Sequence, residues 1–176
     1  MDLGFDVVDL PDCDPPAVGD VVPDFNRPLI TAESWSDSTL SAQTDDGPVV
    51  LVFHPMLGSF PATYVWRGIT TADWVETYGV RPIGITISTP YHARVFLESR
   101  GIDGRLFSDP ANRVACTYDL QHDLDGMAGI VEPRPAVFVL DEDRRVTFSW
   151  WADRWPDLPD WSAVDEAVAS VAGVSA

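Results

Sequence analysis

Two apolar runs constrain the fold of this 176-residue chain more than any other feature. They span residues 49–54 and 83–87, and both are rich in β-branched side chains. Continuous runs of this kind are typical of strands that are buried on both faces of a sheet. Between them, apolar residues recur at helical spacing, which predicts a helix over residues 62–78. A strand, a helix and a second strand in this order indicate an α/β protein.

The other elements follow from turn and cap signals. Helix start and stop signals predict three further helices, over residues 88–101, over 108–118 and from about residue 160 onward. Two apolar segments that flank a charged turn predict a β-hairpin over residues 135–150. The polar residues 36–46 are predicted to be a linker. This order predicts an α/β/α sandwich with a mixed central sheet.

The first 17 residues differ in composition from the rest. They are acidic and contain Pro11, Pro15 and Pro16, which interrupt any helix. We therefore expect an extended or poorly ordered arm over residues 1–17. Residues 18–176 are expected to form a single domain, since their length suits one hydrophobic core.

The net charge of the chain is better explained by adaptation to a salty solvent than by a charged binding partner. The formal net charge is −17, all eleven basic residues are arginines, and aspartate far outnumbers glutamate. This balance resembles that of proteins from extreme halophiles, in which hydrated carboxylates keep a protein soluble in concentrated salt. A cationic partner is the alternative explanation of the acidic surface. Nucleic-acid binding is disfavoured, because phosphate contacts need clustered lysine or arginine.

Neither a membrane segment nor a metal or other cofactor is expected. No apolar stretch approaches the roughly 20 residues of a membrane helix, and the N-terminus lacks the positive start of a secretion signal. A cytoplasmic location is therefore expected. Cys13 and Cys116 are too few for a disulfide framework. His54, His92 and His122 lack metal-ligand spacing and are expected at the surface or at strand ends.

The loop after the first apolar run carries the most specific motif. Residues 53–62 include Pro55, Ser59 and Ala62. This segment resembles the active-site loop of peroxiredoxins, the alkyl hydroperoxide reductase and thiol-specific antioxidant family, which reads Pro-x-x-x-Thr/Ser-x-x-Cys. Pro55 and Ser59 match this pattern. Ala62 stands where the family has its peroxide-attacking cysteine.

Further segments resemble the same family in the same order. They are residues 18–25, 82–88, 106–118 and 138–141. The resemblance covers about residues 18–172 and implies a thioredoxin-like fold. It also implies thiol-dependent peroxide reduction, an antioxidant activity, as the activity of the family.

Two departures from the family pattern argue against that activity in this chain. The methyl group of Ala62 offers no lone pair with which to attack a peroxide oxygen. The arginine that family members carry three residues before the strand phenylalanine is Pro135 here, counted from Phe138. Arg134 is adjacent, but neighbouring strand residues point to opposite faces. We therefore predict a catalytically silent module for binding or assembly.

Pro135 has a second interpretation. Comparison with the thioredoxin-like branch implies a cis-proline that faces the loop, whereas most X–Pro bonds are trans and a strand can simply start at proline. The thioredoxin motif Cys-x-x-Cys would fall on residues 59–62, where both sulfurs are absent. Both geometries of the bond before Pro135 stay open at this point.

Other residues offer alternative sites. Cys116, with or without Cys13, would give a redox-active antioxidant or a thiol–disulfide protein, although the carboxylates beside Cys13 favour its protonated thiol. Two idle thiols are the default in a reducing cytosol. Ser59 would need His54 as its base to act as a nucleophile, and capping the next helix is its simpler role. The same helix start is a candidate pocket for an anion or another polar ligand.

Tryptophans crowd the last quarter of the chain. Strand alternation places Trp150 and Trp151 on opposite faces, so one is expected in the core and the other outside. Trp155 and Trp161 are expected to pack against the final helix, and an aromatic dimer surface is the alternative. A homodimer is therefore one hypothesis, and the sequence identifies no other partner.

Overall fold

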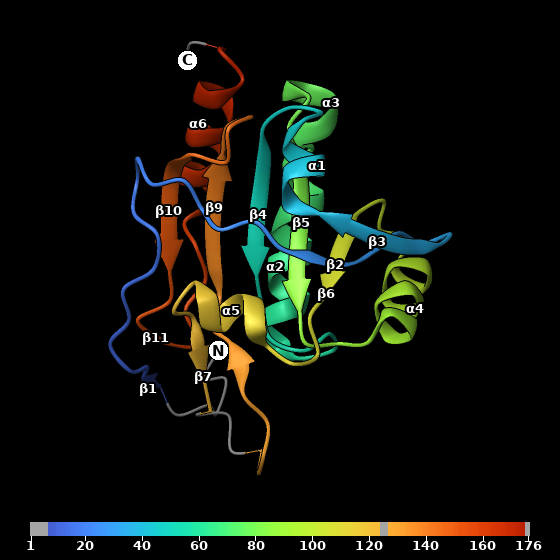
Figure 1. The fold of residues 1–176 in the computed structure, drawn as a ribbon, viewed down its shortest axis with the longest axis vertical. Coiled ribbons are helices and arrows are strands. Elements are labelled where there is room, and N and C mark those ends of the chain that lie inside the picture. Colours follow the sequence, from blue (N-terminus) through green and yellow to red (C-terminus); the bar gives the residue numbers. More distant parts are fainter. Residues whose placement is uncertain (1–6, 124–126, 175–176) are drawn as a thin grey trace.

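The computed structural model describes residues 7–123 and 127–174. Its centre is a mixed seven-stranded sheet with the order β10-β9-β4-β5-β6-β2-β3 (Figure 1). The strands are β2 (Asn26–Ile30), β3 (Trp35–Thr39), β4 (Val49–Phe53), β5 (Arg81–Thr86), β6 (Arg105–Ser108), β9 (Ala136–Leu140) and β10 (Val146–Trp151). β4, β5 and β6 are parallel, and the outer strands pair antiparallel with their neighbours.

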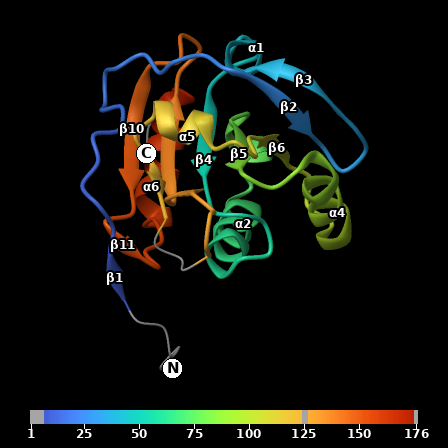
Figure 2. The same cartoon turned by 60° about the horizontal axis from the view of Figure 1, so that its bottom comes forward.

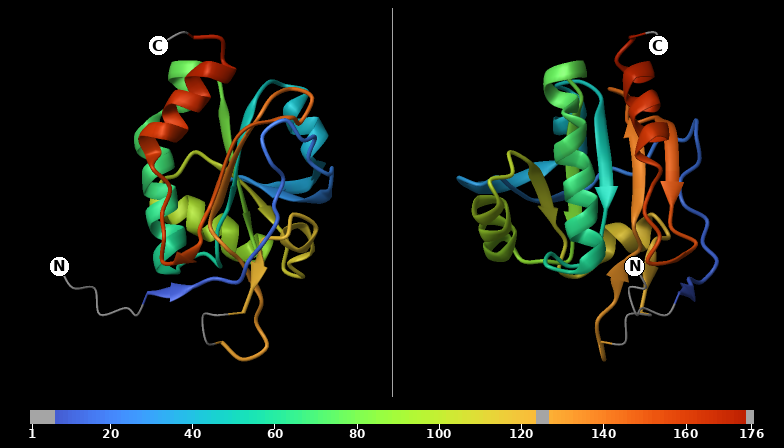
Figure 3. Two further views of the ribbon diagram at one scale, coloured as in Figure 1. Left: turned by 90° about the vertical axis from the view of Figure 1, so that its left-hand side faces the viewer. Right: turned by 180° about the vertical axis from the view of Figure 1, so that it is seen from behind.

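Helices cover both faces of this sheet. Alternate residues of β4 enter two separate cores, with Val50 and Val52 in one and Leu51 and Phe53 in the other. The first core includes side chains of α2 (Phe60–Ala72), α3 (Trp74–Tyr78), α4 (Pro90–Arg100) and α6 (Trp161–Val171). The second includes side chains of α1 (Leu40–Thr44) and α5 (Arg113–Thr117). Figure 3 shows α2 and α6 on one side of the sheet and α1 and α5 on the other, so the predicted α/β/α sandwich is confirmed.

The helix predicted over residues 62–78 is interrupted. α2 ends at Ala72 and α3 starts at Trp74, because Asp73 between them adopts a left-handed conformation with φ of 52°. Aspartate is one of the few residues that enter this region readily. The apolar spacing continues through the buried Trp74, so it does not reveal the break.

The cap signals located α4 and α6 correctly. α4 starts at Pro90 and ends before Gly101, whose φ of 62° is the left-handed geometry that ends many helices. Asp160 accepts a hydrogen bond from the Ser162 amide at the start of α6. The β9–β10 hairpin is also confirmed.

Two predictions for polar segments are wrong. The predicted linker over residues 36–46 contains β3 and α1 instead. β3 is a largely exposed edge strand, so it has no run of apolar residues that would mark it. α5 starts at Arg113 rather than near Pro110, because Asn112 is left-handed with φ of 52°.

The N-terminal segment lies along the outer edge of the sheet. The short strand β1 (Val8–Asp9) pairs with β11 (Arg154–Trp155), and the Gly19 amide then donates to the Val146 carbonyl of β10. Figure 1 shows this segment, in blue, passing outside β10 before it crosses to β2. The backbone of β10 is therefore partly covered at its free edge. Residues 1–6 of the predicted arm lie outside the described residues.

The tryptophans of β10 differ from expectation in one respect. Trp150 and Trp151 lie on opposite faces of the strand, as predicted, and each packs half-buried against a different core. Neither is the outward-facing residue that alternation alone suggests. Trp161 packs against the α2 side of the sheet, with its ring 6.2 Å from that of Trp74.

Candidate functional site

The loop that joins β4 to α2 lies at the carboxyl end of the parallel strands. Residues 54–59 leave β4 and lead into α2, as Figure 2 shows from below the sheet. Ligands of α/β proteins commonly bind beyond this end of the strands. The loop contains Pro55 and Ser59, and Ala62 follows in the first turn of α2.

Ser59 caps α2, which is the simpler of its two predicted roles. Its hydroxyl accepts a hydrogen bond from the Ala62 amide at 3.4 Å, and its carbonyl accepts one from Thr63 Oγ1 at 2.9 Å. Pro61 has no N–H, which suits the first turn of a helix. The protein itself therefore occupies a helix-start amide that an anion would need.

Hydroxyl groups at the end of β5 and just after it hold the loop in place. Thr86 Oγ1 donates to the Pro55 carbonyl at 3.2 Å, and the Leu57 amide donates to Ser88 Oγ at 2.9 Å. All four residues are buried. Because buried backbone groups are costly to leave unpaired, these bonds fix the path of the loop.

Glu132 is the residue of this site that the sequence did not predict. It belongs to β8 (Glu132–Pro133), which pairs with β7 (Gln121–His122) below the sheet in Figure 1. Its side chain is buried, and Oε2 accepts a hydrogen bond from the Met56 amide at 2.6 Å. A carboxylate bonded to a backbone amide is among the stronger hydrogen bonds. No local sequence pattern links β8 to a loop so far away along the chain.

His54 lies at the strand end, as predicted, but it is fully buried rather than at the surface. Its Nε2 accepts a hydrogen bond from Trp66 Nε1 at 3.0 Å, and its Nδ1 donates to the Pro55 carbonyl at 2.8 Å. Burial lowers the pKa of His54 to about 4, so its ring is neutral near pH 7. Both ring nitrogens are engaged, and His54 does not serve as a base for Ser59.

The methyl group of Ala62, in the first turn of α2, is inaccessible to solvent. Arg134 is also buried, and its guanidinium donates to the Ala152 carbonyl at 3.1 Å and to the Pro11 carbonyl at 2.6 Å. Those contacts direct Arg134 toward the N-terminal segment. Both terminal nitrogens of this guanidinium are thus engaged by backbone carbonyls outside the loop.

Pro135 is buried immediately before β9, and its carbonyl accepts a hydrogen bond from the Ala152 amide. Within residues 7–123 and 127–174, the cis peptide bond precedes Pro156. The bond between Arg134 and Pro135 is therefore trans, which settles the geometry that the sequence left open.

Neither cysteine belongs to the loop, and each lies on a different segment of the chain. Cys116 is exposed on α5, which packs on the opposite face of the sheet from α2. Cys13 lies on the N-terminal segment, and both are free thiols. Burial raises the pKa of Cys13, and nearby carboxylates, including that of Asp119, act in the same direction. The Arg134 guanidinium opposes this rise without overcoming it.

The described residues contain no group of three His, Cys, Asp or Glu side chains that could hold a metal ion. Of the helices in the same part of the chain, none has the length and hydrophobicity that a bilayer span requires.

Comparison with known proteins identifies the family. The model of the AhpC/TSA family matches residues 18–149. The chain belongs to the AhpC/TSA family. It is 30% identical over 132 residues to the Mycobacterium tuberculosis protein named "Putative peroxiredoxin Rv1608c", a match that covers 73% of this chain and 80% of that protein.

Solved structures place this AhpC/TSA-family chain in the thioredoxin-like fold. It superposes on the peroxidoxin BcpB of Mycobacterium tuberculosis with a TM-score of 0.72 and 25% identity, covering 92% of this chain and 99% of that one. A thiol peroxidase from Chromobacterium violaceum gives a TM-score of 0.73 at 19% identity, covering 92% and 91% of the two chains. The thioredoxin-like fold predicted from the sequence is therefore confirmed.

Proposed function

We propose that this AhpC/TSA-family protein has no peroxidase activity at its family site and acts as a binding or assembly module. The observation that carries the proposal is the buried methyl group of Ala62 at the nucleophile position, on a loop that remains fixed by hydrogen bonds. The contacts of Arg134 with Pro11 and Ala152 support it, because they engage the guanidinium of the arginine next to Pro135 with backbone carbonyls outside this loop.

The chemistry of the family explains why Ala62 matters. A thiolate sulfur attacks one peroxide oxygen, an S–O bond forms, the O–O bond breaks, and hydroxide leaves. A methyl group has no electron pair for the first step. Ser59 lacks a base, because His54 is bonded to Trp66 and Pro55.

Peroxide consumption in the presence of dithiothreitol tests the proposal. The natural chain is compared with a Cys13→Ser/Cys116→Ser variant, which keeps the fold but has no sulfur that can be oxidised to a sulfenic acid. We expect equal rates. Faster peroxide consumption by the natural chain than by the variant would refute the proposal that the protein has no peroxidase activity.

A redox function of Cys116, with or without Cys13, is the competing proposal. The exposure of Cys116 favours it, since a peroxide can reach that thiol. The raised pKa of Cys13 argues against a reactive pair. Mass spectrometry after peroxide treatment distinguishes the two proposals, because only the redox function yields a sulfenic acid or a disulfide at these positions.

Composition supports finer proposals about setting and assembly. We propose a cytoplasmic protein of halophile type, on the basis of its charge of −17 and its exclusive use of arginine among its basic residues.

Residues 18–176 are proposed as the folding unit, with residues 1–17 as an arm docked on it. Circular dichroism of a chain without the arm checks this division, and loss of the native spectrum would contradict it. Light scattering checks whether the protein forms a homodimer, and a monomeric mass would exclude that assembly.

A further inference from the structure

A polar hollow lies at the end of the sheet opposite the β4–α2 loop. It has a volume of about 330 Å³, and its walls come from the starts of β5 and β6 and from the turn after β2. Its polar lining residues are Thr31, Glu33, Arg81, Asp103 and Arg105. A hollow of this volume is at the lower end of the range found for small-molecule sites.

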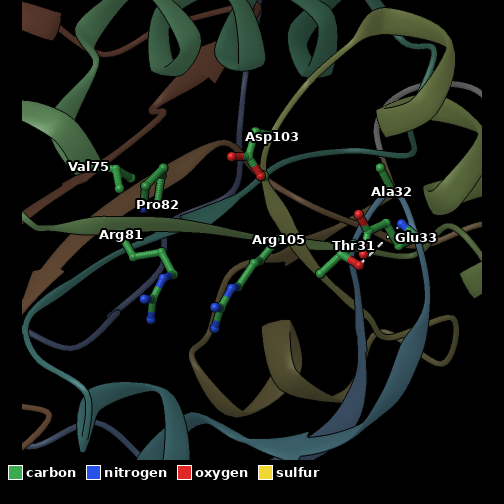
Figure 4. Close-up of a pocket in the computed structure, with 9 residues that line it drawn as sticks. Thr31, Ala32, Glu33, Val75, Arg81, Pro82, Asp103 and Arg105 are labelled. Carbon is green, nitrogen blue, oxygen red and sulfur yellow. Dashed lines mark hydrogen bonds between the residues drawn. The ribbon is translucent and has the colours of Figure 1, made fainter.

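Two arginines lie side by side at this hollow. Arg81 is the first residue of β5 and Arg105 is the first residue of β6, and these strands are neighbours in the sheet. Figure 4 shows both side chains leaving their strands in the same direction, whereas Asp103 extends to the other side. The two guanidinium groups therefore form one cationic spot on a strongly acidic protein.

Arg105 is held in place by a neutral group. Its Nη1 donates to Gln43 Oε1 at 2.6 Å, and Gln43 Nε2 donates to Ser38 Oγ at 3.0 Å. Gln43 is buried, with 7% of its surface exposed. The chain of two hydrogen bonds orients the Arg105 fork without neutralising its charge.

The ion pairing of these two arginines is weak. The ion pair of Arg81 is with Asp46, at 3.9 Å, and the Asp46 side chain is 67% exposed, so this contact is weak. Burial and the charge of Arg81 lower the pKa of Arg105, while Asp46 and Asp103 act in the opposite direction. The fold thus keeps two repelling cations together although the chain carries 28 acidic residues.

We propose that Arg81 and Arg105 bind a phosphate group, either of free phosphate or of a small phosphate monoester. Two arginine forks match the tetrahedral oxygens of phosphate and can share its two negative charges. Bound phosphate would also remove the repulsion between the two guanidinium groups. Glu33 and Asp103 border the same hollow, so the phosphate belongs on its arginine side. The site lies at the other end of the strands from Ala62, and it does not depend on whether the family site is silent.

Isothermal titration calorimetry of the full chain at constant ionic strength tests the proposal. The probes are inorganic phosphate and glycerol 3-phosphate. We expect saturable binding at one site. The affinity for phosphate should be at least tenfold lower in Arg81→Gln and in Arg105→Gln. Tighter binding of glycerol 3-phosphate would identify an ester as the ligand, and equal binding would identify the phosphate group alone.

Arg67→Gln is the matched control. Arg67 is exposed on α2 and its replacement changes the net charge by the same amount, so its affinity for phosphate should equal that of the natural chain. Arg105→Lys keeps the charge without the planar fork, and we expect it to bind phosphate more weakly than the natural chain and more tightly than Arg105→Gln. Absence of saturable binding to the natural chain would overturn the proposal. Equal losses of affinity in Arg67→Gln and Arg81→Gln would also overturn it, because they would show a general charge effect.

Discussion

The indole N–H of Trp66 donates a 3.0 Å hydrogen bond to Nε2 of His54 in the interior of the protein. Nδ1 of the same imidazole bonds the Pro55 carbonyl, so this histidine links α2 to the loop that precedes it. A proton on Nε2 would face the indole N–H and would break the bond. The neutral ring is therefore the form that the fold requires.

His54 makes stability depend on pH in a defined window. Its pKa is about 4 in the folded protein against a usual 6.5, so the unfolded chain binds the proton more readily. Stability should therefore fall as pH drops from 6.5 toward 4, by up to about 3 kcal/mol from this group. Urea unfolding across this range should show a smaller pH effect for His54→Gln than for the natural chain. His92→Gln, at an exposed position, should keep the full effect, and the same pH slope in all three proteins would contradict the role of His54.

Placing a sulfur at position 62 should supply the first step of the family chemistry. Ala62→Cys in the Cys13→Ser/Cys116→Ser background should form a sulfenic acid with hydrogen peroxide, which dimedone labelling detects. The reaction should be slow, because Arg134 remains bonded to Pro11 and Ala152. The added sulfur in a packed position should cost about 1–3 kcal/mol of stability. An unlabelled but folded variant would show that the loop is not competent for the reaction.

Glu132 should stabilise the loop through Met56. Glu132→Ala removes the acceptor of a partly buried amide and should cost about 1 kcal/mol, since that donor loses its charged partner. Glu132→Gln keeps an acceptor and should cost less. Hydrogen exchange at the Met56 amide should accelerate in the alanine variant. Unchanged exchange there would mean that the carboxylate does not hold the loop.

Gly68 should be required for the contact between α2 and α6. A Cβ built on Gly68 would lie 2.3 Å from Cε2 of Trp161, which is far inside van der Waals contact. Gly68→Ala should therefore destabilise the protein by about 1–3 kcal/mol, despite the higher helix propensity of alanine. In a Trp161→Leu background the same substitution should cost much less in denaturant unfolding. Equal costs in the two backgrounds would locate the strain elsewhere.

Salt should stabilise the protein if its acidic surface is an adaptation to brine. Raising KCl from about 0.1 M to about 1 M shortens the screening length from roughly 10 Å to 3 Å, which weakens repulsion among the carboxylates. The melting temperature measured by circular dichroism should rise by several degrees over this range. A constant or falling melting temperature would count against the proposed halophile type.

The sequence predicted the centre of the fold well because its strands are buried on both faces. Such strands, β4 and β5, are recognisable without knowledge of their neighbours. β3 was missed because an exposed edge strand has no apolar pattern. The break at Asp73 was missed because it is a single backbone conformation inside a continuous apolar pattern.

Some features of the candidate site were likewise predicted from the sequence, and others were not. The role of Ser59 as a helix cap was predicted from a local motif and is confirmed. Strand alternation does not apply to Arg134, because Arg134 lies between β8 and β9, where its guanidinium donates to the Pro11 and Ala152 carbonyls. The burial of His54 and the contact of Glu132 with Met56 were not predicted. Both depend on segments that meet only in the folded protein, and a linear pattern carries no signal for them.

The pairing of β1 with β11 sets an order of events during synthesis. Val8 lies opposite Trp155, so the earliest described strand has no partner until almost the whole chain has left the ribosome. Contacts between such distant positions form late, because closing a long loop is entropically costly. A growing chain must therefore keep Val8 and Asp9 unpaired until Arg154 and Trp155 have emerged, and a bulky group fused ahead of Val8 would compete with this late pairing.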